Sequence, residues 1–136
     1  MSNDRTSLVE QLLDHQTAKK KPAGDEETQR FFAFVTGIQD RAQNIEFRKA
    51  EGAWPFREYS YLIGGESLHA GEFWLRFATG ERVTVRGRHL RGLYDKILRH
   101  RVIWIREAET DEEAPDGEPF VDEIEGPVKE EPADLP

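Results

Sequence analysis

The sequence predicts a small single domain of the α+β class, in which a largely antiparallel β-meander packs against one amphipathic helix over residues 88–100. Its 136 residues suffice for one domain and leave little room for a second. Apolar and polar residues alternate between residues 44 and 86, as in half-buried strands, and the period becomes helical after Gly87. The chain is 37% hydrophobic and 34% charged, which indicates a folded centre with polar ends. We therefore divide it into a short helix with a charged linker (1–27), a folded domain (28–108) and a disordered acidic tail (109–136).

A short helix is predicted near the start of the chain, over residues 7–16. Ser7 and Glu10 have the spacing of a capping box. A narrow apolar stripe runs through Leu8, Val9, Leu12 and Leu13. A helix of this length is marginal alone and must dock on another surface to persist. The following stretch, KKKPAGDEE (19–27), has the composition of an exposed linker.

The stretch from residue 29 to residue 42 is ambiguous, and a helix is the favoured interpretation. Its apolar residues fit one helical face: Phe31, Phe34, Val35, Ile38 and Ala42. Three phenylalanines together with valine and threonine also suit a buried strand. Both structures stay open at this point.

Successive strands are predicted from residue 45 onwards. Ile45 and Phe47 share one face of the first strand, and residues 51–55 (EGAWP) have turn chemistry. The stretch FREYSYLI (56–63) is a further strand, which GGES (64–67) ends.

A hairpin is predicted over residues 72–86. Phe73, Leu75, Phe77, Val83 and Val85 point inward. A three-residue loop, Thr79-Gly80-Glu81, with Gly80 at positive φ, would place Phe77 opposite Val83 and Trp74 opposite Arg86. The meander then has one face open to water.

The best helix of the chain follows Gly87. Its apolar residues recur at helical spacing: Leu90, Leu93, Tyr94, Ile97 and Leu98. The next stretch, VIWI (102–105), is apolar on both faces and predicts an interior strand. Residues 82–106 therefore form a strand–helix–strand unit, right-handed if its strands are parallel. Residues 109–136 are acidic and proline-rich, and their one apolar stretch, PFVDEIEG (119–126), is either a docking peptide or merely a less polar part of the tail.

The charges are segregated along the chain, whose net charge is −8. From Glu107 onwards there are 13 acidic residues and one basic residue, so residues 1–106 carry a net charge of +4. Six residues form the candidate anion or nucleic-acid surface: Arg48, Trp74, Arg76, Arg82, Arg86 and Arg88. A tryptophan in a basic field is a stacking platform typical of single-strand nucleic-acid binders. The alternative is a solvated face, on which Asp95 pairs with Arg91 or Arg99 along the helix.

The six residues VRGRHL (85–90) resemble the strand-Arg-Gly segment in the second signature of Sm-like RNA-binding proteins. This resemblance implies an RNA-facing loop at Arg86 and Gly87. The chain carries no counterpart of the first Sm signature, and a helix follows where Sm-like proteins have a short closing strand. The six residues therefore do not assign the chain to that family.

The motifs favour binding over catalysis. The chain has no cysteine, no metalloprotease or phosphate-loop motif and no nucleophile elbow, and His89 and His100 lie too far apart on one helix to share a metal ion. No cofactor is expected. The partner is expected to be a nucleic acid or another polyanion, whose binding the acidic tail modulates, or else a protein anchored by Trp74 and Tyr59 or Tyr61. No membrane-spanning stretch or secretory signal is recognisable, and a cytoplasmic location is expected.

Overall fold

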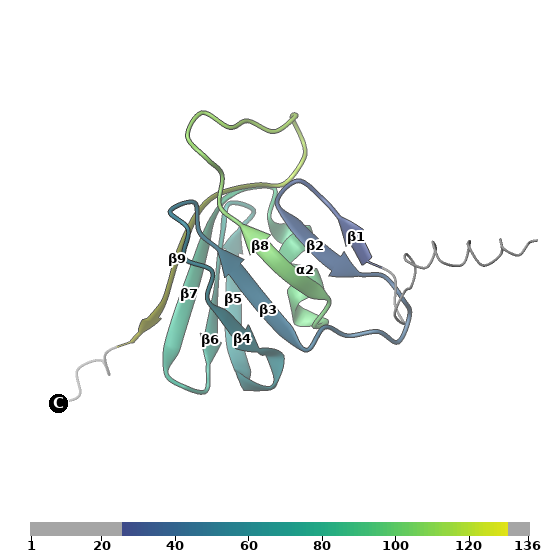
Figure 1. Ribbon diagram of the computed structural model, residues 1–136, viewed down its shortest axis with the longest axis vertical. Coiled ribbons are helices and arrows are strands. Elements are labelled where there is room, and N and C mark those ends of the chain that lie inside the picture. Colours follow the sequence, from purple (N-terminus) through teal and green to yellow (C-terminus); the bar gives the residue numbers. More distant parts are fainter. Residues whose placement is uncertain (1–25, 131–136) are drawn as a thin grey trace, which may run out of the picture.

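The computed structural model describes residues 26–130, which form two β-sheets and one α-helix (Figure 1). The five-stranded sheet has the order β1 (Glu26–Thr28), β2 (Phe32–Val35), β8 (Val102–Arg106), β3 (Asn44–Arg48) and β4 (Phe56–Glu58). The four-stranded sheet has the order β5 (Leu62–His69), β6 (Glu72–Phe77), β7 (Glu81–Arg88) and β9 (Phe120–Lys129). A 3₁₀ turn, η2 (Tyr59–Tyr61), joins the sheets, and α2 (Arg91–Leu98) connects β7 to β8. The predicted helix over residues 7–16 lies outside the described residues.

The core lies between the two sheets, which face each other in Figure 1. Alternation along each strand sends one set of side chains inward, as the sequence predicts. The fully buried ones include Ile45 and Phe47 of β3, and Phe73, Leu75, Phe77, Val83 and Val85 of the β6–β7 hairpin. The rings of Phe47 and Phe77 meet edge to face across the sandwich, with centroids 6.3 Å apart. The described architecture is therefore a mostly β, two-sheet domain with one helix, rather than a single meander.

Helix α2 contacts β5 of one sheet and β8 of the other. Leu93, Tyr94 and Ile97 are buried, as the helical period predicts, whereas Leu98 is 53% exposed. β8 is an interior strand, flanked by β2 and β3, which confirms the prediction for VIWI. Residues 82–106 do form a strand–helix–strand unit, but β7 and β8 belong to different sheets, so the condition of two parallel strands in one sheet is not met, and β8 instead runs parallel to β3.

Three local predictions are wrong, and partner strands explain each of them. Residues 32–35 form β2 rather than a helix, because β1 and β8 pair with them on both sides. GGES does not end a strand, since β5 continues through it while paired with β6. The hairpin loop lies one residue earlier than expected, so the register moves by two: Leu75 faces Val83, and Trp74 faces Thr84. Gly80 does adopt positive φ, at 91°.

The predicted disorder of the acidic tail is wrong for residues 120–129, which form β9. This strand pairs antiparallel with β7 along most of its length and buries Val121 and Ile124. PFVDEIEG is thus a docking segment for its own chain. The folded domain accordingly extends beyond the expected end at residue 108.

Two glycines permit the close approach of β9 to β7. A Cβ at Gly87 would collide with the carbonyl oxygen of Phe120, and one at Gly126 would collide with that of Arg82. Arg86 and Gly87 therefore lie inside a paired strand, opposite Glu123 and Val121, and not in the loop that the Sm-like resemblance implies.

Candidate binding surfaces

Four residues of the expected anion surface lie together on the outer face of the four-stranded sheet. Alternation places Trp74 and Arg76 of β6 on this face, and Arg82 and Arg86 of β7 beside them. Arg88 ends β7 and lies over the ring of Phe120, 4.4 Å from its centroid. Arg48 does not join them, because β3 belongs to the other sheet.

Acidic residues of β9, together with Glu130 directly after it, neutralise this arginine surface. Arg86 forms ion pairs with Glu125 at 3.0 Å and with Glu123 at 3.2 Å. The carboxylate of Glu130 forms ion pairs with both Arg82, at 3.0 Å, and Arg76, at 3.1 Å. The hydrogen bond from Arg82 lowers the pKa of Glu130, so this carboxylate is charged at neutral pH. A phosphate would have to compete with these carboxylates for the guanidinium groups of Arg76, Arg82 and Arg86.

Trp74 is covered by arginine rather than offered to solvent. The guanidinium of Arg82 lies 4.3 Å from the centroid of the Trp74 ring, and that of Arg76 lies 5.6 Å from it. Two of the arginines that were expected to surround a stacking platform thus make cation–π contacts with the Trp74 ring itself.

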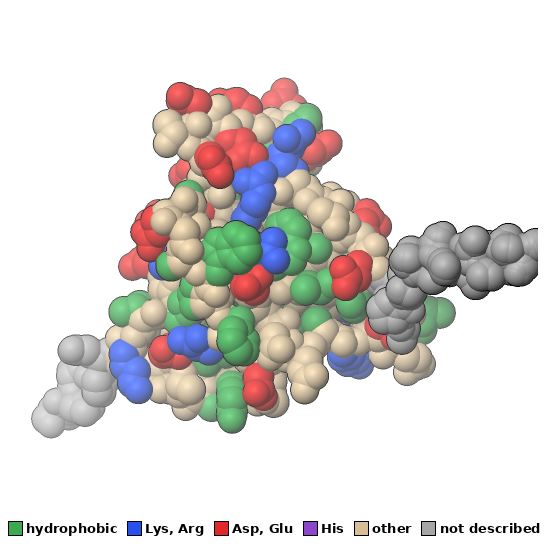
Figure 2. Space-filling model, in the orientation of Figure 1, with side chains coloured by type: hydrophobic (Ala, Val, Ile, Leu, Met, Phe, Trp, Pro, Cys, Tyr) green, Lys and Arg blue, Asp and Glu red, His purple; other side chains and the backbone are tan. Residues whose placement is uncertain are grey.

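A different aromatic cluster lies on the outer face of the five-stranded sheet. Here the guanidinium of Arg48 lies between two indole rings, 4.4 Å from the centroid of Trp54 and 4.5 Å from that of Trp104. Glu46, two residues earlier on the same strand face, accepts a hydrogen bond from Nε of Arg48 at 2.7 Å. We call Trp54, Arg48 and Trp104 the tryptophan–arginine stack. Figure 2 shows hydrophobic and basic side chains adjoining one another in the middle of this face.

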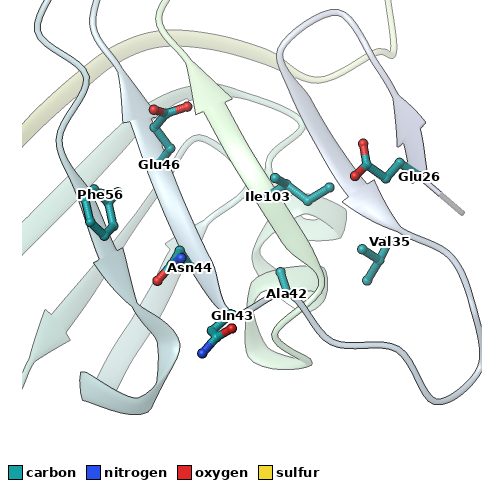
Figure 3. Close-up of a pocket in the computed structure, with 8 residues that line it drawn as sticks. All are labelled: Glu26, Val35, Ala42, Gln43, Asn44, Glu46, Phe56 and Ile103. Carbon is teal, nitrogen blue, oxygen red and sulfur yellow. The ribbon is translucent and has the colours of Figure 1, made fainter. Parts of the chain in front are cut away.

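A groove of about 450 Å³ crosses the same sheet face (Figure 3). Four apolar side chains, two amides and two carboxylates line it, with no lysine or arginine: Glu26, Val35, Ala42, Gln43, Asn44, Glu46, Phe56 and Ile103. Glu46 belongs to the groove and also anchors the stack, so the two features adjoin. The face also exposes large aromatic area, since Trp54 is 53% exposed and Phe56 is 56% exposed.

A bulge in β8 builds part of this surface. Phe34 pairs with Val102, whereas the preceding residue, Ala33, pairs with Trp104, so Ile103 is an extra residue in the ladder. As a result Ile103 lines the groove while its neighbour Trp104 contacts Arg48. Regular alternation would have sent these two side chains to opposite faces.

Sequence reasoning missed Trp54, Phe56, Ile103 and Trp104 as surface residues. The stretch EGAWPF offered one signal, because it sets two aromatic residues beside turn chemistry, where a core position is hard to reach. No signal marked Ile103 and Trp104. Of the tyrosines proposed as anchors, Tyr59 is buried and donates a hydrogen bond to the Val102 carbonyl oxygen, while Tyr61 is 47% exposed. Burial raises the pKa of Tyr59.

Among residues 26–130, the strongest shifts in the pKa of carboxyl groups come from ion pairs with arginine. Glu81 and Glu112 have pKa values lowered to about 2 by hydrogen bonds from Arg57 and Arg106, respectively, which keeps both carboxylates charged. Within residues 26–130, no three histidine or acidic side chains are grouped so that they would hold a metal ion. His69 accepts a hydrogen bond from the Gly71 amide, and His100 stacks on Tyr59 with centroids 4.6 Å apart.

None of the helices described is both long and apolar enough to cross a membrane. Family models, curated proteins and solved structures were compared with the chain, and none of them matches it.

Proposed function

We propose that the protein is a non-catalytic binding module that holds a segment of a partner protein on the outer face of its five-stranded sheet. The observation that carries this proposal is the tryptophan–arginine stack beside an open groove. Tryptophan and arginine are the residue types that most often dominate the energy of protein interfaces. We place this activity in the cytoplasm, a reducing compartment that suits a chain without cysteine.

The stack is ordered before a partner arrives. Arg48 contacts both indole rings and is fixed at Nε by Glu46, so each of the three long side chains restricts the others. Binding to a preordered surface loses less side-chain entropy, at about 0.5–1.5 kcal/mol for each side chain that need not be immobilised. A partner that covers the exposed part of Trp54 therefore retains most of the energy of burying it.

The chemistry of the groove defines the partner segment. Val35, Ala42, Phe56 and Ile103 suit an aliphatic side chain, and Glu26 adds an exposed carboxylate at one side. A lysine or arginine next to that aliphatic residue complements the acid, and no basic side chain of the groove opposes it. The expected partner is a short segment that combines aliphatic and basic residues.

The test is a selection of peptides from a random displayed library on the full chain. We expect selected peptides to place an aliphatic residue beside lysine or arginine, and to lose about tenfold or more in affinity, or about 1.4 kcal/mol, with Trp54→Ala or Phe56→Ala. Ile63→Ala is the matched control, because Ile63 is 62% exposed but belongs to the other sheet. Circular dichroism verifies that each variant is folded. Equal affinity for all three variants would refute the proposed site.

Two other occupants are outcomes of the same test. Residues 8–21 of this chain also combine leucines with lysines, and if they compete for the groove, Leu12→Asp with Leu13→Asp raises the affinity for the selected peptides. If a second copy of the chain occupies the face, light scattering shows a dimer that Trp54→Ala dissociates. Either result would mean that this segment or the second copy, and not a separate partner protein, occupies the face.

Nucleic-acid binding through Trp74, Arg76, Arg82 and Arg86 is the second candidate, because the sheet does gather these four residues on one face. Arg48 and Arg88 would contribute little to it from their observed positions. This function requires displacement of Glu123, Glu125 and Glu130. It predicts that Glu123→Gln with Glu125→Gln increases the affinity for a single-stranded oligonucleotide, with a steep loss on added salt. Unchanged binding in that variant argues against the second candidate.

A further inference from the structure

A second hollow, of about 400 Å³, lies where α2 ends and meets the loop between β2 and β3. Its lining is mostly cationic: Arg41, Leu98, Arg99, His100 and Arg101. Arg41 comes from the loop, whereas the other residues follow or end the helix, so two distant parts of the chain bring their charges together. None of these residues belongs to the face proposed above, and the inference is independent of that function.

Arg101 is the fixed member of this cluster. Its Nη1 donates hydrogen bonds to the carbonyl oxygens of Gly37 at 2.8 Å and Val35 at 3.1 Å, and its Nη2 donates one to Ile38 at 2.9 Å. Carbonyl groups satisfy N–H groups without cancelling the charge. Three of the five N–H groups of the guanidinium are engaged in this way, and two stay available to a ligand.

No arginine of this cluster forms an ion pair among residues 26–130. Arg57, Arg82, Arg86 and Arg106 each form an ion pair with a glutamate. In the same part of the chain, the ion pairs include none made by Arg41, Arg99 or Arg101, and none made by the nearby Asp40 or Asp95. The expected pairing of Asp95 with Arg91 or Arg99 is therefore not formed. Lys96 adds a further cation, with Nζ 4.9 Å from the centroid of Phe34.

A structural role alone does not account for the whole cluster. Basic residues are favourable near the C-terminus of a helix, where the carbonyl groups carry partial negative charge, by about 0.3–1 kcal/mol each. That effect explains Lys96 and Arg99. It does not explain why Arg41 comes to the same hollow from a loop, in a chain whose net charge is −8.

We propose that this hollow binds a phosphate group of a phosphorylated ligand, with Arg41, Arg99 and Arg101 as the contacting residues. Guanidinium groups match phosphate oxygens with two parallel hydrogen bonds, and converging arginines are the usual way to hold a phosphate group. The ligand carries at least two linked phosphates, because the three guanidinium cations exceed the charge of about −2 that one phosphate group carries. An inorganic polyphosphate and a nucleic-acid backbone both supply this chemistry.

The test is a calorimetric titration of the full chain with inorganic tripolyphosphate at about 0.15 M salt. We expect Arg41→Glu and Arg99→Glu each to weaken binding about tenfold or more. Arg91→Glu is the matched control: it makes the same change of charge on the same helix, about 12 Å from Arg99 along its axis. We expect it to weaken binding less than threefold, because this distance exceeds the Debye length of about 8 Å at 0.15 M salt. Arg101 is left intact because it also holds the loop between β2 and β3.

Amide chemical shifts in a parallel titration locate the site. We expect the largest changes at residues 41 and 98–101. The same titration with a ten-nucleotide single strand distinguishes the two kinds of ligand. Tighter binding than that of tripolyphosphate, with the same response to the variants, identifies a nucleic-acid backbone as the ligand. Weaker binding identifies a small polyphosphorylated molecule. The proposal is overturned if tripolyphosphate does not bind, or if Arg91→Glu reduces binding as much as Arg99→Glu.

Discussion

At the scale of single residues, the ion pair between Arg57 and Glu81 links the two sheets. Arg57 lies in β4, and Glu81 begins β7. Two guanidinium nitrogens reach the two carboxylate oxygens, each at 2.8 Å, and Thr79 donates a further hydrogen bond to Glu81. Paired hydrogen bonds of this kind are stronger than a single contact between exposed charges. The pair therefore resists sliding of one sheet over the other.

This ion pair makes stability depend on pH. The pKa of Glu81 is about 2 in the folded chain, below its ordinary value of about 4.5, so its contribution is complete above pH 4.5 and is lost as pH falls towards 2. We expect Glu81→Gln to lower the free energy of unfolding by about 1 kcal/mol at pH 7 and by almost nothing at pH 2.

Urea denaturation at several pH values measures this difference. Glu51→Gln is the control, because Glu51 is exposed and belongs to no ion pair described for residues 26–130. A difference between wild type and Glu81→Gln that stays constant from pH 7 to pH 2 would contradict the assignment.

At the scale of elements, Gly87, which faces β9, and Gly92, which lies in α2, differ in the space available for a side chain. Gly87 has no room for a side chain, because the carbonyl of Phe120 occupies that place. Gly92 lies in the helix, is exposed, and has nothing within 4 Å of the position that a Cβ would take. The same substitution should therefore have opposite effects at the two positions.

We expect Gly87→Ala to destabilise the chain by about 2 kcal/mol or more, because β9 must move away from β7. Gly92→Ala should stabilise it by about 0.5–1 kcal/mol, the usual difference between alanine and glycine within a helix. Thermal unfolding of both variants, followed by circular dichroism, measures the two effects. Equal shifts of Tm in the same direction would disprove the close packing of β9.

Elements with a regular period could be predicted from the sequence, and those defined by a partner could not. The period of α2 and the alternation in β6 and β7 identified Leu93, Ile97, Leu75 and Val85 as core residues. β9 has no such signal, since its buried residues, Val121 and Ile124, lie three apart across a register shift and are surrounded by acids. This segment becomes a strand because it pairs with the otherwise unpaired edge of β7.

The candidate surfaces follow the same division. Alternation alone places Trp74, Arg76, Arg82 and Arg86 on one face. It says nothing about which sheet Arg48 joins, nor that a bulge turns Ile103 and Trp104 outward. The acids that neutralise the arginines lie in β9 or directly after it, so they could not be predicted without that strand.

At the scale of the whole molecule, the sandwich depends on β9. This strand closes one edge of the four-stranded sheet and contributes Val121 and Ile124 to the shared core. Burial of these two side chains contributes about 3–6 kcal/mol, compared with about 5–15 kcal/mol for the net stability of a typical domain. Removal of the strand therefore threatens the entire fold.

We expect a chain ending at Ala108 to lose cooperative thermal unfolding and dispersed amide resonances. A chain ending at Glu130 keeps every described strand and should behave as the full chain does. Circular dichroism and a proton–nitrogen correlation spectrum distinguish the two. An unchanged Tm for the chain that ends at Ala108 would mean that β9 adds nothing to the core.

The arginines of β7 and their glutamates also differ in when they leave the ribosome. Glu123 follows Arg86 by 37 residues, and Glu130 follows Arg82 by 48. At a synthesis rate of about 5–20 residues per second, roughly 2–10 s separate each arginine from its acid. During that interval β7 has an unpaired edge, and Arg82 and Arg86 lack the carboxylates that β9 and Glu130 supply, so this part of the growing chain attracts polyanions more strongly than the finished protein does.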